Sequence, residues 1–473
     1  MISKPILKQS IKNNWKLWAI ITTVASIILS GFIISYDAVE YAALAVAAEG
    51  TAFASLFSSA TTLLGSLENF YKLIAVILGI VYTVFTANNL VVNEVDSGSM
   101  AYTLSTPITR SSVIFSKSLY LILSTTLMYF IISMVGLGVV QFQYNNVSGY
   151  PITDDIKVAA KSLNQKESYV SERLYLILND TDALSEGALE RDMDIEAYTL
   201  YLENKIIDRT FEENAIIITD ERYDLYDDVL EDDEIEITYE ALIKNPKMIL
   251  DSQDALKHGA KTMGLSLNDY HHFVTTYIAH DDIESIDNDT TSMIFNKIID
   301  VSAETLNLSH QQVKQNLSLL KTPEALDSST KVSGLSRQQI IDMANKTMIE
   351  AAISVDNALD FDTEAYFYLS IGLALLILSL SSISFFASTL FNRTNFSLAL
   401  GGGVPFAFFL ITMVQQLMDS SDNLKYLNLT TLFNTEEILI LGDFKYGLLA
   451  LLLIATVLYT VSNFIFTKKD LPL

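Results

Sequence analysis

The stretch LIAVILGIVYTVFTANNLVVNEVDSGSMAYTLSTPITRSSVIFSKSLYLILSTTLMYFIISMVGLGVV, residues 73–140, sets two long apolar runs on either side of a short polar segment. The runs, Leu73–Val92 and Val113–Val140, are nearly free of charged residues. Each reaches the roughly 20 apolar residues that a helix needs to cross a bilayer. The segment between them, residues 93–112, is polar and holds one of only seven prolines. We therefore expect two membrane helices joined by a structured connection.

Four further runs have the same character, and a helix satisfies every backbone polar group inside hydrocarbon. The sequence predicts a polytopic α-helical membrane protein with six transmembrane helices. No small-residue cleavage site follows the first run, so we expect it to be retained as a span. The six predicted spans are Leu17–Tyr36, Leu73–Val92, Val113–Val140, Tyr366–Phe391, Leu398–Met418 and Tyr446–Phe466.

The formal charge of −26 is concentrated in one insert between the third and fourth spans. Between Gln143 and Thr363 there are 18 Lys and Arg against 43 Asp and Glu, whereas the remainder has 12 against 13. Apolar residues recur three and four apart through most of this insert, which is typical of helices. AIIITDERYDLY (215–226) and IEITY (235–239) are more typical of short strands. We predict a mainly α domain with a minor β element, residues 143–363.

Lysine and arginine mark the cytoplasmic side of short membrane loops. With six spans, all the basic loops fall on one side, so both termini are predicted to be cytoplasmic in a multi-pass protein of the cell membrane. The acidic domain 143–363 and the loop 419–445 then lie outside. The basic loop residues are Lys4, Lys8, Lys12, Lys16, Arg110, Lys117, Arg393, Lys468 and Lys469.

One segment could change this count. Tyr41–Leu67 is about long enough to span and carries only Glu49, but it is rich in Ala, Ser, Thr and Gly. If it crossed, Arg110 and Lys117 would move outside, against the basic leader. We favour an external amphipathic hairpin, residues 37–71, over a seventh span.

The serines, acidic clusters and histidines of the insert are each explained by ordinary structural roles. Ser266, Ser309 and Ser336 each precede an amphipathic run and are predicted N-caps, with a repeated binding module as the alternative. The acidic clusters Asp227–Glu236 and His280–Thr290 lack the calcium-loop order and suit a solvated face or weak divalent binding. No histidine pair has the zinc-enzyme spacing; the five are His258, His271, His272, His280 and His310.

Motifs of catalysis and nucleotide binding are missing. There is no phosphate loop, no glycine-rich dinucleotide fingerprint and no nucleophile elbow. Cysteine is absent, which excludes disulfides and Cys-based zinc sites on this chain. We predict no catalytic residues, no metal site, no cofactor on this chain and no nucleic-acid partner. Ionisable residues are nearly absent from the predicted spans, which disfavours an ion-coupled carrier.

The polar segment has an ordered set of residues: Glu94, Gly98-Ser99, an apolar stretch, then Pro107-Ile108-Thr109-Arg110, and Lys117 at the start of the next span. It resembles the connection between the second and third spans of ABC-2-type transporter permeases, where threonine usually stands in place of Ser99. LKYLNLTTLFNTEEILILGDFKYG (424–447) and the ending FTKKDLPL are also similar to that family. The resemblance covers roughly residues 1–142 and 364–473.

This resemblance implies a dimer with a second permease, the same or homologous, bound to two copies of a separate ATP-binding subunit that carries ATP and Mg. Residues 93–112 would be the cytoplasmic coupling helix, residues 1–16 an amphipathic leader on the membrane surface, and 419–445 an external re-entrant segment. The membrane parts are then 17–142 and 364–473. The implied coupling residues are Glu94, Gly98, Tyr102, Pro107, Arg110 and Lys117.

The expected function is a permease subunit of an ATP-driven exporter for an amphipathic substrate, such as an antimicrobial or other peptide, a drug or a lipid-like molecule. An acidic exterior would attract cationic peptides. The alternative is a non-transporting signalling or mechanotransmission subunit whose external domain regulates an extracellular partner. Candidate path residues are the amides Asn88, Asn89, Gln415 and Gln416, for which helix–helix hydrogen bonding is an equal alternative.

Overall fold

The computed structural model describes residues 2–51, 54, 57, 59–226, 235–277, 288–417 and 428–470. The chain divides into two compact units, Met1–Ser148 with Asn357–Leu473 (unit 1) and Gly149–Asp356 (unit 2). Both units are built of helices, and no strand occurs within the described ranges.

The predicted β element is therefore wrong where it can be assessed. Residues 215–226 belong to the long helix α13 (Ile195–Tyr226). Phe211, Ala215 and Ile218 are buried in one cluster at helical spacing, while Ile216 points outward, so the run of isoleucines continues a helical face. The backbone N–H of Ile237 donates to the hydroxyl of Thr219 at 2.9 Å, a contact with a helix side chain in place of a strand partner.

Unit 1 contains the six predicted membrane helices. Among the described residues, six helices are long and apolar enough to cross a membrane, which confirms the predicted number. Their bounds are Lys4–Ile34, Leu63–Asp96, Arg110–Tyr144, Thr363–Leu390, Thr394–Gln415 and Lys445–Lys468. The predicted leader residues continue without a break into the first of them, and Met418, the predicted end of the fifth span, lies outside the described residues.

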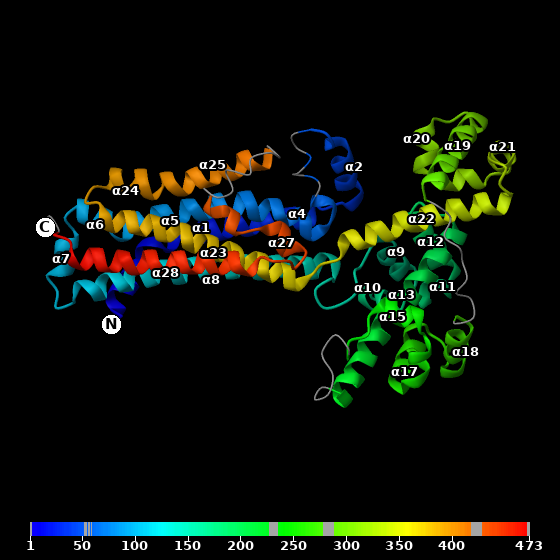
Figure 1. Cartoon of the computed structure of the whole chain (residues 1–473), viewed down its shortest axis with the longest axis horizontal. Helices are drawn as coiled ribbons and strands as arrows, with labels where there is room; N and C mark the ends of the chain where they lie inside the picture. Colours follow the sequence, from blue (N-terminus) through cyan, green and yellow to red (C-terminus); the bar gives the residue numbers. More distant parts are fainter. Residues whose placement is uncertain are drawn as a thin grey trace. The chain divides into compact units, whose positions relative to one another are not determined.

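The described helices of unit 1, in chain order, are α1 (Lys4–Ile34), α2 (Ala38–Ala48), η1 (Ser59–Thr61), α4 (Leu63–Asn69), η2 (Phe70–Ile74), α5 (Ala75–Leu90), α6 (Val92–Asp96), α7 (Met100–Leu104), α8 (Arg110–Tyr144), α23 (Thr363–Leu390), α24 (Thr394–Gly401), α25 (Gly403–Leu417), η5 (Leu429–Leu432), α27 (Thr435–Leu439) and α28 (Lys445–Lys468). Figure 1 shows α1, α5, α8, α23, α25 and α28 running along one direction, with both termini, α6 and α7 at one end of the bundle.

Helix α23 lies at the centre of the bundle and packs against α5, α8 and α28, while α1 packs against α8. Close approach depends on two glycines. A Cβ on Gly79 would stand 2.1 Å from the hydroxyl of Tyr129, and one on Gly136 would stand 2.2 Å from that of Tyr366. Both tyrosine hydroxyls donate to backbone carbonyls of neighbouring helices. Small residues thus let these helices meet at backbone distance, as is usual in membrane bundles.

Unit 2 is a purely helical domain over its described residues. Its helices are α9 (Asp154–Ser162), α10 (Glu167–Ser171), α11 (Tyr175–Leu178), α12 (Thr181–Glu190), α13, α15 (Tyr239–Lys244), α16 (Lys247–Asp251), α17 (Gln253–Thr262), α18 (Leu267–Tyr277), α19 (Asn288–Leu306), α20 (His310–Gln315), η4 (Leu317–Lys321), α21 (Pro323–Ser333) and α22 (Arg337–Leu359), which ends just past the unit boundary.

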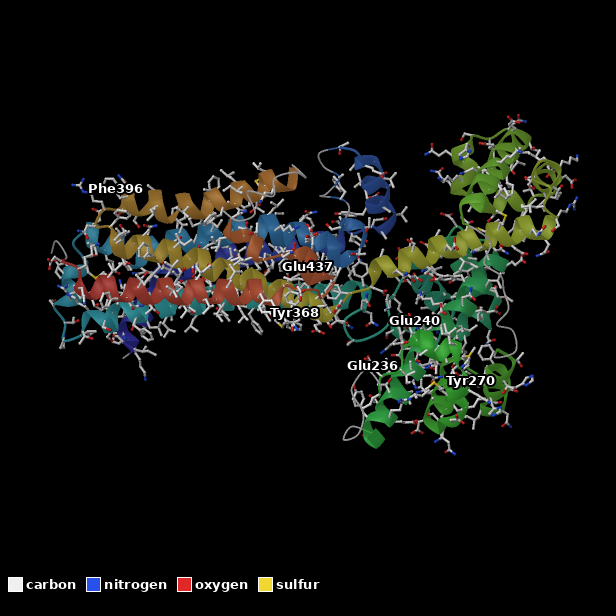
Figure 2. All side chains as sticks on the ribbon, in the orientation of Figure 1. Glu236, Glu240, Tyr270, Tyr368, Phe396 and Glu437 are labelled. Carbon is white, nitrogen blue, oxygen red and sulfur yellow. The ribbon has the colours of Figure 1, made fainter. Side chains whose placement is uncertain are left out.

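Two apolar clusters form the core of unit 2, and α13 contributes to both. The first half of α13 packs with α9, α12, α19 and α22. Its second half packs with α17 and α18, where Tyr270, labelled in Figure 2, lies fully buried. A Cβ on Gly259 would stand 2.3 Å from the ring of Tyr270, so glycine is required for α17 to meet α18.

A buried set of charges joins four parts of unit 2. Arg191 pairs with Asp155 at 3.0 Å and with Asp356 at 2.7 Å, and Lys205 pairs with Asp356 at 2.6 Å. Tyr201 also donates a hydrogen bond to Asp356. Two cations balance two carboxylates here, so none of these charges is buried without a partner.

Candidate functional site

The connection between α5 and α8 and the first two turns of α8, together residues 93–117, are termed here the junction segment. Helix α5 ends where Val91 leaves helical geometry, and α6 follows at once. Gly98 then takes a φ of +72°, a conformation that other residues rarely adopt, and α7 begins two residues later. Thr109 caps α8 by accepting a bond from the N–H of Ser112, with Pro107 just before it. The sequence thus folds into two short helices with a fixed turn between them.

A buried ion pair holds the start of this segment. The ammonium of Lys117, on α8, lies 2.6 Å from a carboxylate oxygen of Glu94, on α6, and the lysine side chain is only 3% exposed. The same ammonium donates to the backbone carbonyl of Leu90, the last residue of α5. Because helix C-terminal carbonyls have no partner within their own helix, this lysine caps α5 and pairs with α6 at once.

Two further contacts tie the segment to distant parts of the chain. Asp96 accepts hydrogen bonds from the backbone N–H of Thr394 at 3.1 Å and from its hydroxyl at 2.9 Å, which joins α6 to the start of α24. Arg110 donates to the carbonyl of Lys469 at 3.0 Å, at the end of α28. The ammonium of Lys469 donates in turn to the carbonyls of Thr389 and Leu390, which end α23.

Helix α1 is also connected to the segment. The backbone N–H of Ser3 donates to the hydroxyl of Ser116 at 2.8 Å. A chain of amides runs from Asn93 through Asn89 to the buried Asn14, with N–O distances of 3.1 and 2.9 Å. Five of the six apolar helices therefore contain or contact the junction segment directly. The remaining one, α23, is connected to it through Lys469, which bonds both Arg110 and the end of α23.

The most exposed large hydrophobic side chain of the junction segment is that of Tyr102, which makes none of the anchoring contacts described above. Tyr102, on α7, is 81% exposed, whereas Met100 of the same short helix is fully buried. Pro107 is also exposed, as are Ser105 and Thr106. The segment thus combines a buried, anchored side with an aromatic group on its free side.

Of the predicted coupling residues, the structure brings Glu94 and Lys117 together and places Arg110 against the C-terminal tail. Gly98 shapes the backbone, and Tyr102 and Pro107 are on the surface. The sequence did not identify Asp96 or Lys469 as anchors. Asp96 could have been noticed from its place in the polar run, whereas the role of Lys469 depends on contacts with residues about 80 positions away.

The candidate path amides form tertiary hydrogen bonds in two cases. Asn89 donates to Asn14, and Gln415 accepts from Asn428 at 3.0 Å. Asn88 is buried and donates to Val84 on its own helix at 2.8 Å. The side chain of Gln416 lies outside the described residues. Asn89 thus joins α5 to α1, and Gln415 joins α25 to the N-cap residue of η5. A place for these amides on a translocation path stays a prediction.

The end of unit 1 away from the termini has its own buried charge. Glu68 on α4 pairs with Lys72 at 2.6 Å and accepts a hydrogen bond from Thr435 on α27 at 2.5 Å. Lys72 also reaches Glu436 at 3.2 Å. Figure 2 labels the neighbouring Glu437 of α27 at this end of the bundle. These contacts fasten the described part of the 419–445 segment to the second span; residues 419–427 lie outside the described ranges.

In unit 2, His258 pairs with Glu213 at 2.7 Å and His310 with Asp300 at 2.6 Å. Within the part of the chain that the structure describes, no group of three or more His, Asp or Glu side chains could hold a metal ion. Most of the two acidic clusters, including residues 227–234 and 280–287, lies outside the described residues. The predicted N-caps are confirmed for Ser266, Ser309 and Ser336, whose hydroxyls accept the expected backbone bonds.

Comparison with protein-family models gives one match: residues 4–159 match the family described as "ABC-2 family transporter protein". The matched range contains α1 to α8 and with them the whole junction segment. A search of curated proteins gave no match.

Proposed function

We propose, from the match of residues 4–159 to the ABC-2 transporter family, that this chain is an ABC-2-type permease and the transmembrane subunit of an ATP-driven exporter. The junction segment, residues 93–117, is the docking point for a separate ATP-binding subunit. The observation that carries this proposal is the combination of the exposed Tyr102 with polar anchors that lead from the same segment to all six apolar helices.

The orientation rests on charge. The end of unit 1 that holds both termini carries the basic leader, Arg110, Arg393 and the tail lysines Lys468 and Lys469. Excess lysine and arginine favour the cytoplasmic side, where an ATP-binding subunit would be found. The acidic domain, connected to the other ends of α8 and α23, is then extracytoplasmic.

The coupling mechanism follows from the anchors. An ATP-binding subunit bound to α7 would move α6 with it, because only three residues, 97–99, separate the two helices and the hydroxyl of Ser99 donates to the carbonyl of Glu94. Lys117 would pass this movement to α5 and α8, and Asp96 and Arg110 would pass it to α24 and α28. The Lys117–Glu94 pair is buried within the packed bundle, and packed interiors transmit displacement because they have low compressibility.

Two such permeases with two ATP-binding subunits would enclose the path. We propose an amphipathic, cationic substrate, for which a peptide is the first choice. Its support is the −25 net charge of residues 143–363, since a field of one sign raises the local concentration of oppositely charged molecules.

The test is transport by the reconstituted pair. The chain and a candidate ATP-binding subunit are placed together in vesicles, and movement of a fluorescent cationic peptide is followed with ATP. A partner variant that binds but does not hydrolyse ATP is the control. ATP-dependent movement supports an exporter. ATP hydrolysis stimulated by the permease, with no movement of peptide, drug or lipid probe, would instead support the signalling alternative.

A further inference from the structure

Helix α2 (Ala38–Ala48) is apolar on the side that faces away from the protein. Its sequence, AVEYAALAVAA, contains one charged residue, Glu40, in the first turn. We propose that α2 lies flat in the lipid–water interface, with its outward face against the acyl chains and headgroups of the leaflet at the end of unit 1 away from the termini. This inference goes beyond the proposed function and does not depend on an ATP-binding partner.

The two faces of α2 are distinct. The protein side is made by residues three and four apart, of which Ala38 and Ala48 are buried and Tyr41 and Ala45 half-buried. The ring of Tyr41 lies 5.2 Å from that of Tyr36, centre to centre, and fastens this face to the end of α1. The outward face carries Val39, Glu40, Ala42, Ala43, Leu44, Val46 and Ala47, with Val39 64% and Val46 73% exposed.

The length and position of α2 suit an interfacial helix. At about 1.5 Å per residue, 11 residues extend about 16 Å, roughly half of the hydrocarbon thickness of about 30 Å. It therefore cannot span. It begins four residues after α1 ends, and Asp37 caps it by accepting bonds from the N–H groups of Val39 and Glu40. Figure 1 shows α2 running across the direction of the bundle helices.

Lipid is the occupant that fits this face best. A helix whose free side faced water would carry several polar residues there, whereas the outward side of α2 has one, Glu40 in the first turn. A protein partner would be expected to find aromatic or arginine anchors, and the face offers alanine, valine and one leucine. Ile27 and Ile34, near the end of α1 that leads into α2, are exposed apolar side chains as well.

The test uses the absence of cysteine from the chain, which allows single labels without background. Val46→Cys is labelled with an environment-sensitive fluorophore in the full chain in nanodiscs. Lys257→Cys, on the exposed surface of unit 2, is the water control, and Leu453→Cys, exposed within α28, is the lipid control. Ala43→Cys provides a second outward position if Val46→Cys fails to fold.

We expect the label at Val46 to emit at shorter wavelength than the label at Lys257 and to be quenched by iodide several-fold less. A nitroxide near the lipid headgroup should quench it more than a nitroxide at the bilayer centre, with the reverse order for Leu453. Iodide quenching equal to that at Lys257 would overturn the proposal. So would protection from iodide without quenching by either lipid nitroxide, because that pattern means a protein covers the face.

Discussion

The ammonium of Lys117 lies 2.6 Å from the carboxylate of Glu94 and donates to the carbonyl of Leu90, so one side chain of α8 holds both the end of α5 and the start of α6. The connection between the second and third apolar helices is thereby fixed to both of them. A displacement of this connection would therefore also displace the ends of α5 and α8.

Removing one member of the Lys117–Glu94 pair should lower the free energy of unfolding. Lys117→Met leaves the carboxylate of Glu94 without its cation and the carbonyl of Leu90 without its donor, and the loss of one partner of a buried pair costs about 3–5 kcal/mol. We expect a lower thermal unfolding temperature of the purified full chain, followed by size-exclusion chromatography after heating.

The double variant Glu94→Gln with Lys117→Met is the matched comparison. Because it removes both charges together, it should recover much of the stability that Lys117→Met loses. If the single variant were as stable as the wild type, the pair would have no holding role.

Replacing Lys469 should loosen the end of α23, and replacing its neighbour Lys468 should not. Lys469 donates to the carbonyls of Thr389 and Leu390, whereas the ammonium of Lys468 lies over the ring of Phe464 on its own helix. Lys469→Met should therefore raise hydrogen–deuterium exchange at residues 387–391, the end of α23, and Lys468→Met should not. Equal exchange in both variants would contradict the assigned anchor.

Unit 2 should lose stability in acid through Asp356. Burial alone would raise the pKa of this carboxyl, but Lys205 and Arg191 beside it bring the pKa below its ordinary value of 3.8. The folded state thus favours the ionised form. The stability that it contributes is complete above pH 3.8 and is lost as the pH falls through the lower, folded-state pKa.

Asp356→Asn should accordingly increase hydrogen–deuterium exchange in α13 and α22 at pH 7, after correction for intrinsic rates. The difference from wild type should shrink below the ordinary pKa of aspartate. Asp254→Asn, which changes an exposed carboxylate paired with Lys257, is the control and should have little effect at either pH. A difference that is independent of pH would point to packing in place of charge.

Local chemistry was predictable from the sequence. The N-caps at Ser266, Ser309 and Ser336 depend only on residues three positions away, and the apolar runs mark six helices by length alone. The strand prediction at 215–226 failed because three isoleucines in a row suit either structure, and packing of Phe211, Ala215 and Ile218 on one face decides for a helix.

Longer-range features could not be read from the sequence. The second apolar helix begins at Leu63 and not near Leu73, because Glu68 and Lys72 pair one turn apart and Thr435 supplies a further bond. The anchors of the junction segment join residues about 300 positions apart, such as Asp96 and Thr394, and no periodicity reveals them.

The central claim is that the junction segment binds an ATP-binding subunit through α7. The most direct measurement is the affinity of that subunit for the purified chain carrying Tyr102→Ala, with Tyr446→Ala as control, since both tyrosines are about equally exposed, at 81% and 80%. Loss of an aromatic anchor costs about 2 kcal/mol, so we predict roughly thirty-fold weaker binding for Tyr102→Ala. Tyr446→Ala, at the other end of the bundle, should bind as the wild type does. Unchanged affinity for Tyr102→Ala would contradict the account.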